Sequence, residues 1–168
     1  MSHIRFPVTP GFGFVRLREL NLRTYVRFRG QPGIYFFTLD TDNLLGQWIG
    51  RKFFHLPYRL RRLQGSVRNK DYLFKSADSL QLRAQIGEPC VSGSLDRWLV
   101  ERYSLFTRGK DAFFRGDVLH ESWQLSQVEE LDVSESLSEE FGFGSTSDWH
   151  ARYAEVLDVR FRPFTKLF

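Results

Sequence analysis

The sequence predicts an α+β fold, in which a mainly antiparallel curled sheet or barrel carries one main helix packed on it. Segments that alternate apolar and polar residues recur along most of the chain, and only one long stretch has helical spacing instead. Aromatic residues make up 16% of the chain and include 17 Phe, which favours thick hydrophobic layers or a cavity lined by rings. A length of 168 residues suits one domain with a real core, so we expect a single domain over residues 1–168.

The first predicted strands, residues 17–29 and 33–40, form a hairpin around "GQPG", where Pro32 and Gly33 suit a type II turn. An irregular lead-in precedes them. Alternation gives the first strand one polar face, which either meets water or lines a pocket. The residues of this face are Glu19, Asn21, Arg23, Tyr25 and Arg27.

A helix is predicted next, because the pattern changes to a helical period. Thr41 or Asp42 can cap its start, and Pro57 ends it. Its apolar positions include Leu44, Leu45, Trp48, Ile49 and Phe53.

The rest of the chain predicts further strands, with turns near residues 69–71 and 77–79 and a short helical turn at 94–99. Residues 134–148, rich in Ser, Glu and Gly, predict a loop with one helical turn, in which Glu139 and Glu140 are expected to be solvated. The segment "EVLDVRFRPF" predicts a final strand.

A second polar pair lies in "DRWLVERYSLFTR", where Glu101 and Tyr103 fall on one face of a predicted buried strand. A buried Glu needs a partner such as Arg23 to remain ionised, because desolvating a lone carboxylate is costly. The alternative is that Glu101 pairs with a neighbouring Arg and has a purely structural role.

Charge is unevenly distributed along the chain. Residues 1–75 hold 14 Lys and Arg against 4 Asp and Glu, whereas residues 76–168 hold 10 against 16. The basic stretch "RKFFHLPYRLRRLQGSVRNK" is the best candidate for nucleic-acid binding. Its charges alternate with Leu and Val as they do on the outside of a strand, so we favour two halves that neutralise each other and expect no nucleic-acid partner.

Cofactor and metal motifs are absent from the sequence. The four His residues are scattered, and no C-x-x-C, P-loop or G-x-S-x-G occurs, so we predict neither a metal nor a cofactor. The single Cys90 cannot form an internal disulfide, which fits a reducing compartment. No apolar leader or long apolar run is visible, so the expected location is the cytoplasm, without a membrane partner.

Four ordered motifs, "ELNLRTYV", "PGIYFFTLD", "GRKFFHLPY" and "ERYSLFT", together resemble the YqjF-like family of uncharacterised bacterial proteins. That family is grouped with the acetoacetate decarboxylase-like fold. The resemblance implies a closed or nearly closed antiparallel barrel around a pocket, with Glu19, Asn21, Arg23 and Tyr25 facing its lumen.

The related decarboxylases carry a motif G-R-E-x-x-G-[FY]-P-K, whose lysine forms a Schiff base with the substrate. Here Gly50, Arg51 and Pro57 agree with the motif, but Tyr58 stands in the place of the lysine. A phenol cannot form an imine, so this position does not offer that route to decarboxylation.

The resemblance implies a pocket that binds a small, acidic organic molecule. Glu19 corresponds to an acidic pocket residue, and Arg23 clamps the ligand's carboxylate. Candidate ligand-binding residues are Asn21, Arg23, Tyr25, Arg51, Tyr58 and Tyr103. The alternatives are an enzyme that uses Glu19 or Glu101 as general acid or base, and a purely structural network.

The resemblance also implies further strands before the region that starts here, so we expect either a short or an N-terminally truncated family member. Missing barrel strands would expose a sheet edge, which favours a homo-oligomer.

Overall fold

The computed structural model describes residues 3–5, 15–16, 18–77, 79–144, 147–156 and 158–168, and these residues form two sheets and two α-helices. The larger sheet has the order β2 (Val15–Arg16), β1 (His3–Arg5), β13 (Asp158–Phe161), β10 (Phe113–Leu119), β9 (Ser104–Arg108), β4 (Gln31–Thr41), β3 (Glu19–Phe28). Two further strands join it, β5 (Tyr58–Leu60) beside β4 and β14 (Thr165–Lys166) beside β10. The smaller sheet has the order β12 (Arg152–Tyr153), β11 (Leu125–Glu135), β8 (Leu80–Cys90), β7 (Asp71–Ser76), β6 (Leu63–Arg68).

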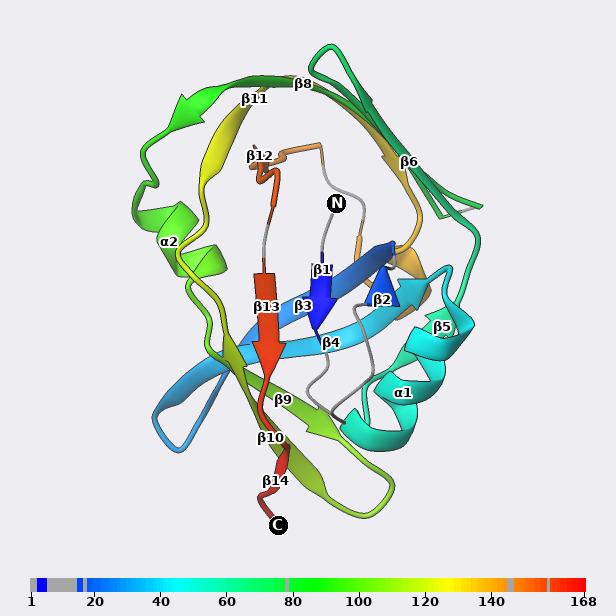
Figure 1. Ribbon diagram of the computed structural model, residues 1–168, viewed down its shortest axis with the longest axis vertical. Coiled ribbons are helices and arrows are strands. Elements are labelled where there is room, and N and C mark those ends of the chain that lie inside the picture. The colour runs from blue at the N-terminus through cyan, green and yellow to red at the C-terminus, as the bar shows by residue number, and fades with distance from the viewer. Residues whose placement is uncertain (1–2, 6–14, 17, 78, 145–146, 157) are drawn as a thin grey trace.

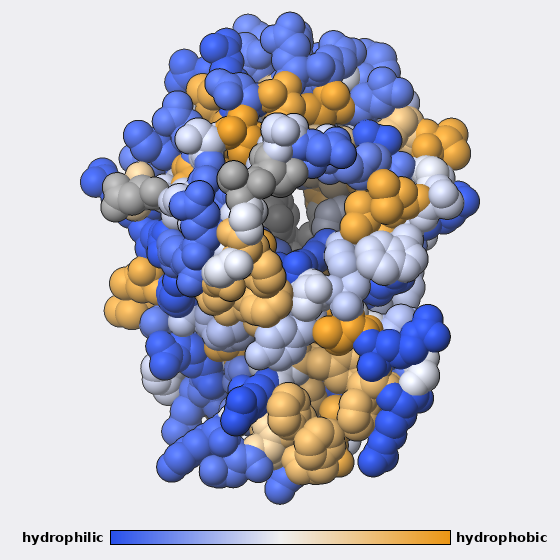
Figure 2. Space-filling model, turned by 180° about the vertical axis from the view of Figure 1, so that it is seen from behind, coloured by the Kyte–Doolittle hydropathy of each residue, from blue (hydrophilic) through white to orange (hydrophobic). Residues whose placement is uncertain are grey.

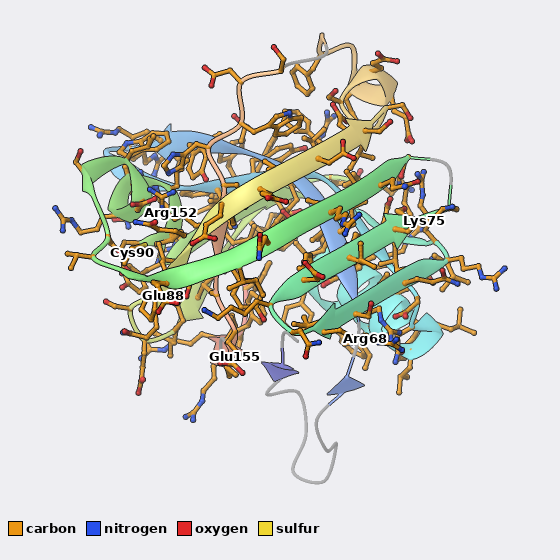
Figure 3. All side chains as sticks on the ribbon, turned by 90° about the horizontal axis from the view of Figure 1, so that it is seen from above. Arg68, Lys75, Glu88, Cys90, Arg152 and Glu155 are labelled. Carbon is orange, nitrogen blue, oxygen red and sulfur yellow. The ribbon has the colours of Figure 1, made fainter. Side chains whose placement is uncertain are left out.

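The smaller sheet curves as an arch over β3 and β4 (Figure 1). The predicted fold class is confirmed: strands dominate, the sheet is curled into a half-barrel, and one longer helix packs on it. Seen from above, β6, β7, β8 and β11 lie side by side across the top of the molecule (Figure 3). Their polar outer face contains a trough of about 570 Å³, which includes Lys75, Arg83 and Asp132 among its lining residues.

The β3–β4 hairpin forms as predicted, but its turn differs. Phe28 pairs with Gln31, so Arg29 and Gly30 form the two-residue loop, with φ values of 47° and 83°. Pro32 lies inside β4 instead of in the turn. Positive φ at both loop residues is the signature of a type I′ turn, whose twist matches that of the paired strands.

The main helix α1 (Leu44–Phe54) also forms as predicted, with a different cap. Asn43, and not Thr41 or Asp42, is the N-cap, and its side-chain oxygen accepts a 2.9 Å hydrogen bond from the Gly46 amide. At the other end His55 adopts a left-handed conformation, and the Leu56 amide donates to the Gly50 carbonyl at 3.1 Å. The chain therefore turns sharply out of the helix and enters β5.

Helix α1 connects β4 to β5, which are parallel, and β9 also pairs with β4 in parallel. The sequence predicted mainly antiparallel pairs. The parallel β4–β5 pair depends on the crossover through α1, whereas β4 and β9 are separated in the chain by several strands and α2 as well. The core lies beneath this crossover and comprises Ile34, Leu39, Ile49, Phe54, Leu56, Tyr58, Leu105 and Val118.

A buried ion cluster joins the two halves of the chain on the opposite face of β4. The fully buried carboxylate of Asp40 accepts hydrogen bonds from Arg59 at 2.7 and 3.0 Å, and Arg61 lies 3.1 Å away. Both guanidinium groups also pair with Glu140, in the 3₁₀ turn Glu139–Phe141. Glu140 is therefore an ion-pair partner, in contrast to the predicted solvated acid, and the charge excess of the N-terminal half is partly neutralised by the C-terminal half.

Candidate functional site

The polar face of β3 meets Tyr58, which is the first residue of β5 and follows α1 after a short connection. In the β3–β4–β5 register, Glu19 lies opposite Thr41, Asn21 opposite Leu39, and Leu39 opposite Tyr58, which places these side chains on one face. The Tyr58 hydroxyl donates to Glu19 Oε2 at 2.6 Å, and Asn21 Nδ2 donates to Glu19 Oε1 at 3.2 Å. Both oxygens of the Glu19 carboxyl thus have a fixed donor.

The ring of Tyr58 is held from behind by the helix. Tyr58 is only 3% exposed, and a Cβ atom added to Gly50 would lie 2.3 Å from ring carbon Cδ2. Only a residue without a side chain fits at position 50. The helix thereby fixes the direction in which the Tyr58 hydroxyl points.

Burial raises the pKa of the Glu19 carboxyl above its ordinary value of 4.5, although hydrogen bonds from Tyr58 and Asn21 and the charge of Arg23 oppose the shift. Burial, together with the neighbouring Glu19, also raises the pKa of the Tyr58 phenol well above 10. The phenol therefore stays a donor at neutral pH, and Glu19 holds its proton to a higher pH than an exposed glutamate does.

We predict that this pair gives the protein a pH-dependent stability. Because the folded state holds the Glu19 proton more tightly than the unfolded chain, the free energy of unfolding falls as pH rises from about 4.5 through the raised pKa of Glu19. Glu19→Gln should remove this part of the slope, measured by urea unfolding at a series of pH values. The exposed Glu121→Gln is the control, and an unchanged slope in Glu19→Gln would contradict the prediction.

Arg23 lies two residues after Asn21 on the same face of β3. Its guanidinium lies 5.8 Å from the centroid of the Tyr25 ring, and among the described residues no carboxylate is within ion-pair distance of it. Arg23 lowers the pKa of Glu19, so the two charges are near each other without forming an ion pair. An unpaired, partly buried guanidinium is a candidate binding group for an anion.

Tyr25 has a structural role in this arrangement. Its hydroxyl donates to the Leu99 carbonyl at 3.1 Å, and its ring contacts Trp98 with centroids 4.4 Å apart. Arg102 lies over both rings. These contacts attach β3 to helix α2 (Ser94–Val100) and use the one polar group of Tyr25.

Glu101 and Tyr103 do not join the Glu19 network. Helix α2 ends at Glu101, and β9 begins only at Ser104, so the predicted buried strand does not include either residue. Tyr103 is 43% exposed and its hydroxyl donates to the Glu101 carboxylate, while its ring stacks on His120 at 4.6 Å. The partner of Glu101 is thus Tyr103, and not Arg23.

Arg51 lies elsewhere again, on the exposed side of the last turn of α1. It lines a groove of about 530 Å³ between the end of this helix, β4 and the loop after β9. The structure thus separates Arg51 from the predicted ligand-binding residues of the β3 face, while Tyr58 lies at both places, since its hydroxyl binds Glu19 and it also lines the groove. Other residues of the groove come from the C-cap of α1 (His55), the end of β9 (Thr107 and Arg108) and the loop after it (Lys110), and the sequence patterns did not single them out.

The described part of the chain offers neither a metal-binding cluster nor a membrane-spanning helix. No group of three or more His, Cys, Asp or Glu residues there could hold a metal ion. No described helix combines the length and the apolar character that a membrane crossing requires.

A hollow is visible near the middle of the back face (Figure 2).

Comparisons with solved structures identify the fold. The acetoacetate decarboxylase of Legionella pneumophila matches with a TM-score of 0.60 and 12% identity, over 74% of this chain and 55% of the enzyme. The enduracididine biosynthesis enzyme MppR, complexed with pyruvate, matches with a TM-score of 0.56 and 10% identity, over 88% of this chain and 62% of MppR. This chain therefore spans less than two thirds of the length of these structures, and identities this low show the fold alone.

Sequence comparisons identify the family. The family DUF2071, described as an uncharacterized conserved protein, matches residues 1–158. The uncharacterized protein YqjF of Bacillus subtilis (strain 168) is 36% identical over 171 residues, covering 95% of this chain and 69% of YqjF. The chain therefore belongs to the DUF2071 family, as a YqjF-like protein with an acetoacetate decarboxylase-like fold.

Proposed function

We propose that the chain binds a small carboxylic acid on the polar face of β3, with Arg23 binding the carboxylate and Glu19 facing the rest of the ligand. The observation that carries this proposal is the guanidinium of Arg23, which has no carboxylate partner among the described residues and lies near a carboxyl group whose pKa is raised. Two parallel N–H groups of a guanidinium match the two oxygens of a carboxylate.

Glu19 adds selectivity to this arrangement. A bound carboxylate near Glu19 disfavours a second negative charge, so the ligand increases the protonated fraction of Glu19. Protonated Glu19 can then donate a hydrogen bond to an uncharged oxygen of the ligand, such as a keto oxygen. The expected ligand class is therefore the small keto or hydroxy acids.

A solved structure with the same fold supports a ligand as small as a keto acid. MppR, which shares the fold, has been solved in complex with pyruvate. The motif "GRKFFHLPY" has Tyr58 in the place of the Schiff-base lysine, and the Tyr58 hydroxyl contacts Glu19 at 2.6 Å. In our proposal this position supplies a hydrogen bond and no covalent attachment.

A second candidate function is general acid–base catalysis at Glu19, with Arg23 orienting the substrate. The raised pKa of Glu19 favours it, because such a group exchanges its proton closer to neutral pH than an ordinary glutamate. Glu101, whose partner is the exposed Tyr103, has no such environment. Under this proposal Glu19→Gln retains ligand binding and loses turnover.

We predict that pyruvate and related keto acids raise the melting temperature of the protein and that Arg23→Ala weakens their binding by about 10- to 100-fold. The measurement is calorimetric titration of the purified chain with a panel of small carboxylic and keto acids. Arg27→Ala, an exposed arginine further along the same face of β3, is the matched control and should bind like the unmodified chain. Equal affinity of Arg23→Ala and the unmodified chain would overturn the proposal.

A further inference from the structure

We propose that the groove beside α1 is a second ligand site for a phosphorylated small molecule with a planar ring, and among its described lining residues it shares only Tyr58 with the Glu19 network on the β3 face. The groove of about 530 Å³ is within the usual size range of small-molecule sites. We call it the basic groove. Its lining residues include Tyr35, Phe37, Arg51, His55, Arg108 and Lys110.

The topology of the larger sheet creates this groove. Strand β9 pairs with β4 at Ile34–Tyr35, and β5 pairs with β4 at Leu39–Thr41, both in parallel. Between these two contacts, β4 passes from its pairing with β9 to its pairing with β5. The groove lies there, and Phe36 and Phe37 of β4 line it. The groove therefore results from the way in which β5 and β9 share one edge of β4.

The charge of the basic groove is positive and largely uncompensated. Arg51, Arg108 and Lys110 line it, and within the described residues none of the three has a carboxylate within ion-pair distance. Arg59 also lines the groove, but Asp40 and Glu140 already pair with it. Among the described lining residues there is no Asp or Glu. Several unpaired cations around one concave site suit a ligand with more than one negative charge.

Several contacts hold together the ends of α1 and β9, which form one wall of the basic groove. The Thr107 hydroxyl donates to the His55 carbonyl at 2.6 Å, which attaches the end of β9 to the end of α1. The His55 ring stacks on Phe114 with centroids 4.3 Å apart and planes inclined by 22°. Gly109 permits this approach, because a Cβ there would lie 2.8 Å from the Phe114 ring. The end of β9 with Arg108, and the following loop with Lys110, are therefore positioned before any ligand arrives.

The basic groove also offers aromatic surface. Tyr35 and Phe37 line the groove from β4 and contact each other edge to face, with centroids 5.7 Å apart. Phe141 also lines the groove and contacts Phe37 at 6.0 Å. A planar ring can stack on such a surface while its phosphate group reaches the cations that line the same groove.

The test is a calorimetric titration with adenosine monophosphate and with adenosine. We expect adenosine monophosphate to bind, adenosine to bind at least tenfold more weakly, and both Arg51→Ala and Lys110→Ala to weaken adenosine monophosphate by about tenfold. Lys52→Ala is the matched control, since Lys52 is an exposed cation of the same helical turn that does not line the groove.

Each remaining outcome contradicts the proposal. No heat of binding with millimolar adenosine monophosphate, or equal losses in Arg51→Ala and Lys52→Ala, would show that the groove is not a built site. Tight, strongly salt-dependent binding of a single-stranded oligonucleotide with no measurable binding of adenosine monophosphate would assign the groove to nucleic acid instead.

Discussion

Replacing Gly50 with alanine is expected to lower the free energy of unfolding by about 2–3 kcal/mol, although alanine is the better helix former. The added methyl group would lie 2.3 Å and 2.5 Å from two carbons of the Tyr58 ring. That ring is 3% exposed, and its hydroxyl is bound to Glu19, so it cannot move away without breaking the 2.6 Å hydrogen bond. The substitution therefore disrupts the packing of α1 on β5 and the Glu19 network together.

Urea unfolding of Gly50→Ala measures this effect, with Lys52→Ala as the control in the same helix. Lys52 is exposed, so its replacement should change stability by less than about 0.5 kcal/mol. Gly50→Ala has two effects, a clash with the Tyr58 ring and a disturbed hydrogen bond to Glu19. The double variant Gly50→Ala/Tyr58→Leu has no ring at position 58, so it separates the cost of the clash from that of the hydrogen bond. A Gly50→Ala protein more stable than the unmodified chain would mean that the helix does not press on Tyr58.

Asp40→Ala is expected to lower the free energy of unfolding by about 3 kcal/mol, the lower end of the usual cost of breaking a buried ion pair. The carboxylate of Asp40 is fully buried and binds Arg59, Arg61 and the Thr38 hydroxyl, the last at 2.9 Å. The two arginines are partly exposed and keep Glu140 as a partner, which limits the loss. Solvent can hydrate the charges that remain.

Asp42→Ala is the matched control for this substitution. Asp42 is two residues further along the chain and pairs with Arg18 at 2.8 Å on the surface, where an ion pair contributes at most about 1 kcal/mol. Thermal or urea unfolding of both variants gives the comparison. Similar losses in the two variants would contradict the role assigned to the buried cluster.

Local patterns in the sequence were enough to predict much of the fold. Period-two alternation identified β3 and β4, and the helical period identified α1, because these signals depend only on neighbouring residues. The parallel pairing of β4 with β5 and β9 was not predictable in this way, because it depends on which distant strands meet. The turn at Arg29–Gly30 was displaced by two residues, since "PG" is a strong turn signal that the register of the hairpin overrides.

The candidate site was predictable only in part. Alternation placed Glu19, Asn21 and Arg23 on one face of β3, and the structure adds Tyr58 to them through β4. The interpretation of Glu101 as a strand residue was wrong, because α2 continues to Val100 and the alternating pattern around Glu101 is too short to distinguish the two states. Only one side of the basic groove had a sequence signal, in Arg51 and Tyr58 and in the basic stretch that holds them, because Arg108 and Lys110 come from the end of β9 and the loop after it, far along the chain.

The central claim, that Arg23 and Glu19 form a carboxylate-binding site, is tested most directly by a crystal structure of this chain grown with pyruvate. Our account predicts that the carboxylate of pyruvate lies within hydrogen-bond distance of the Arg23 guanidinium, with its keto oxygen toward Glu19. Pyruvate bound in the basic groove with the β3 face empty, or an Arg23 side chain paired with a protein carboxylate in that crystal, would contradict the account.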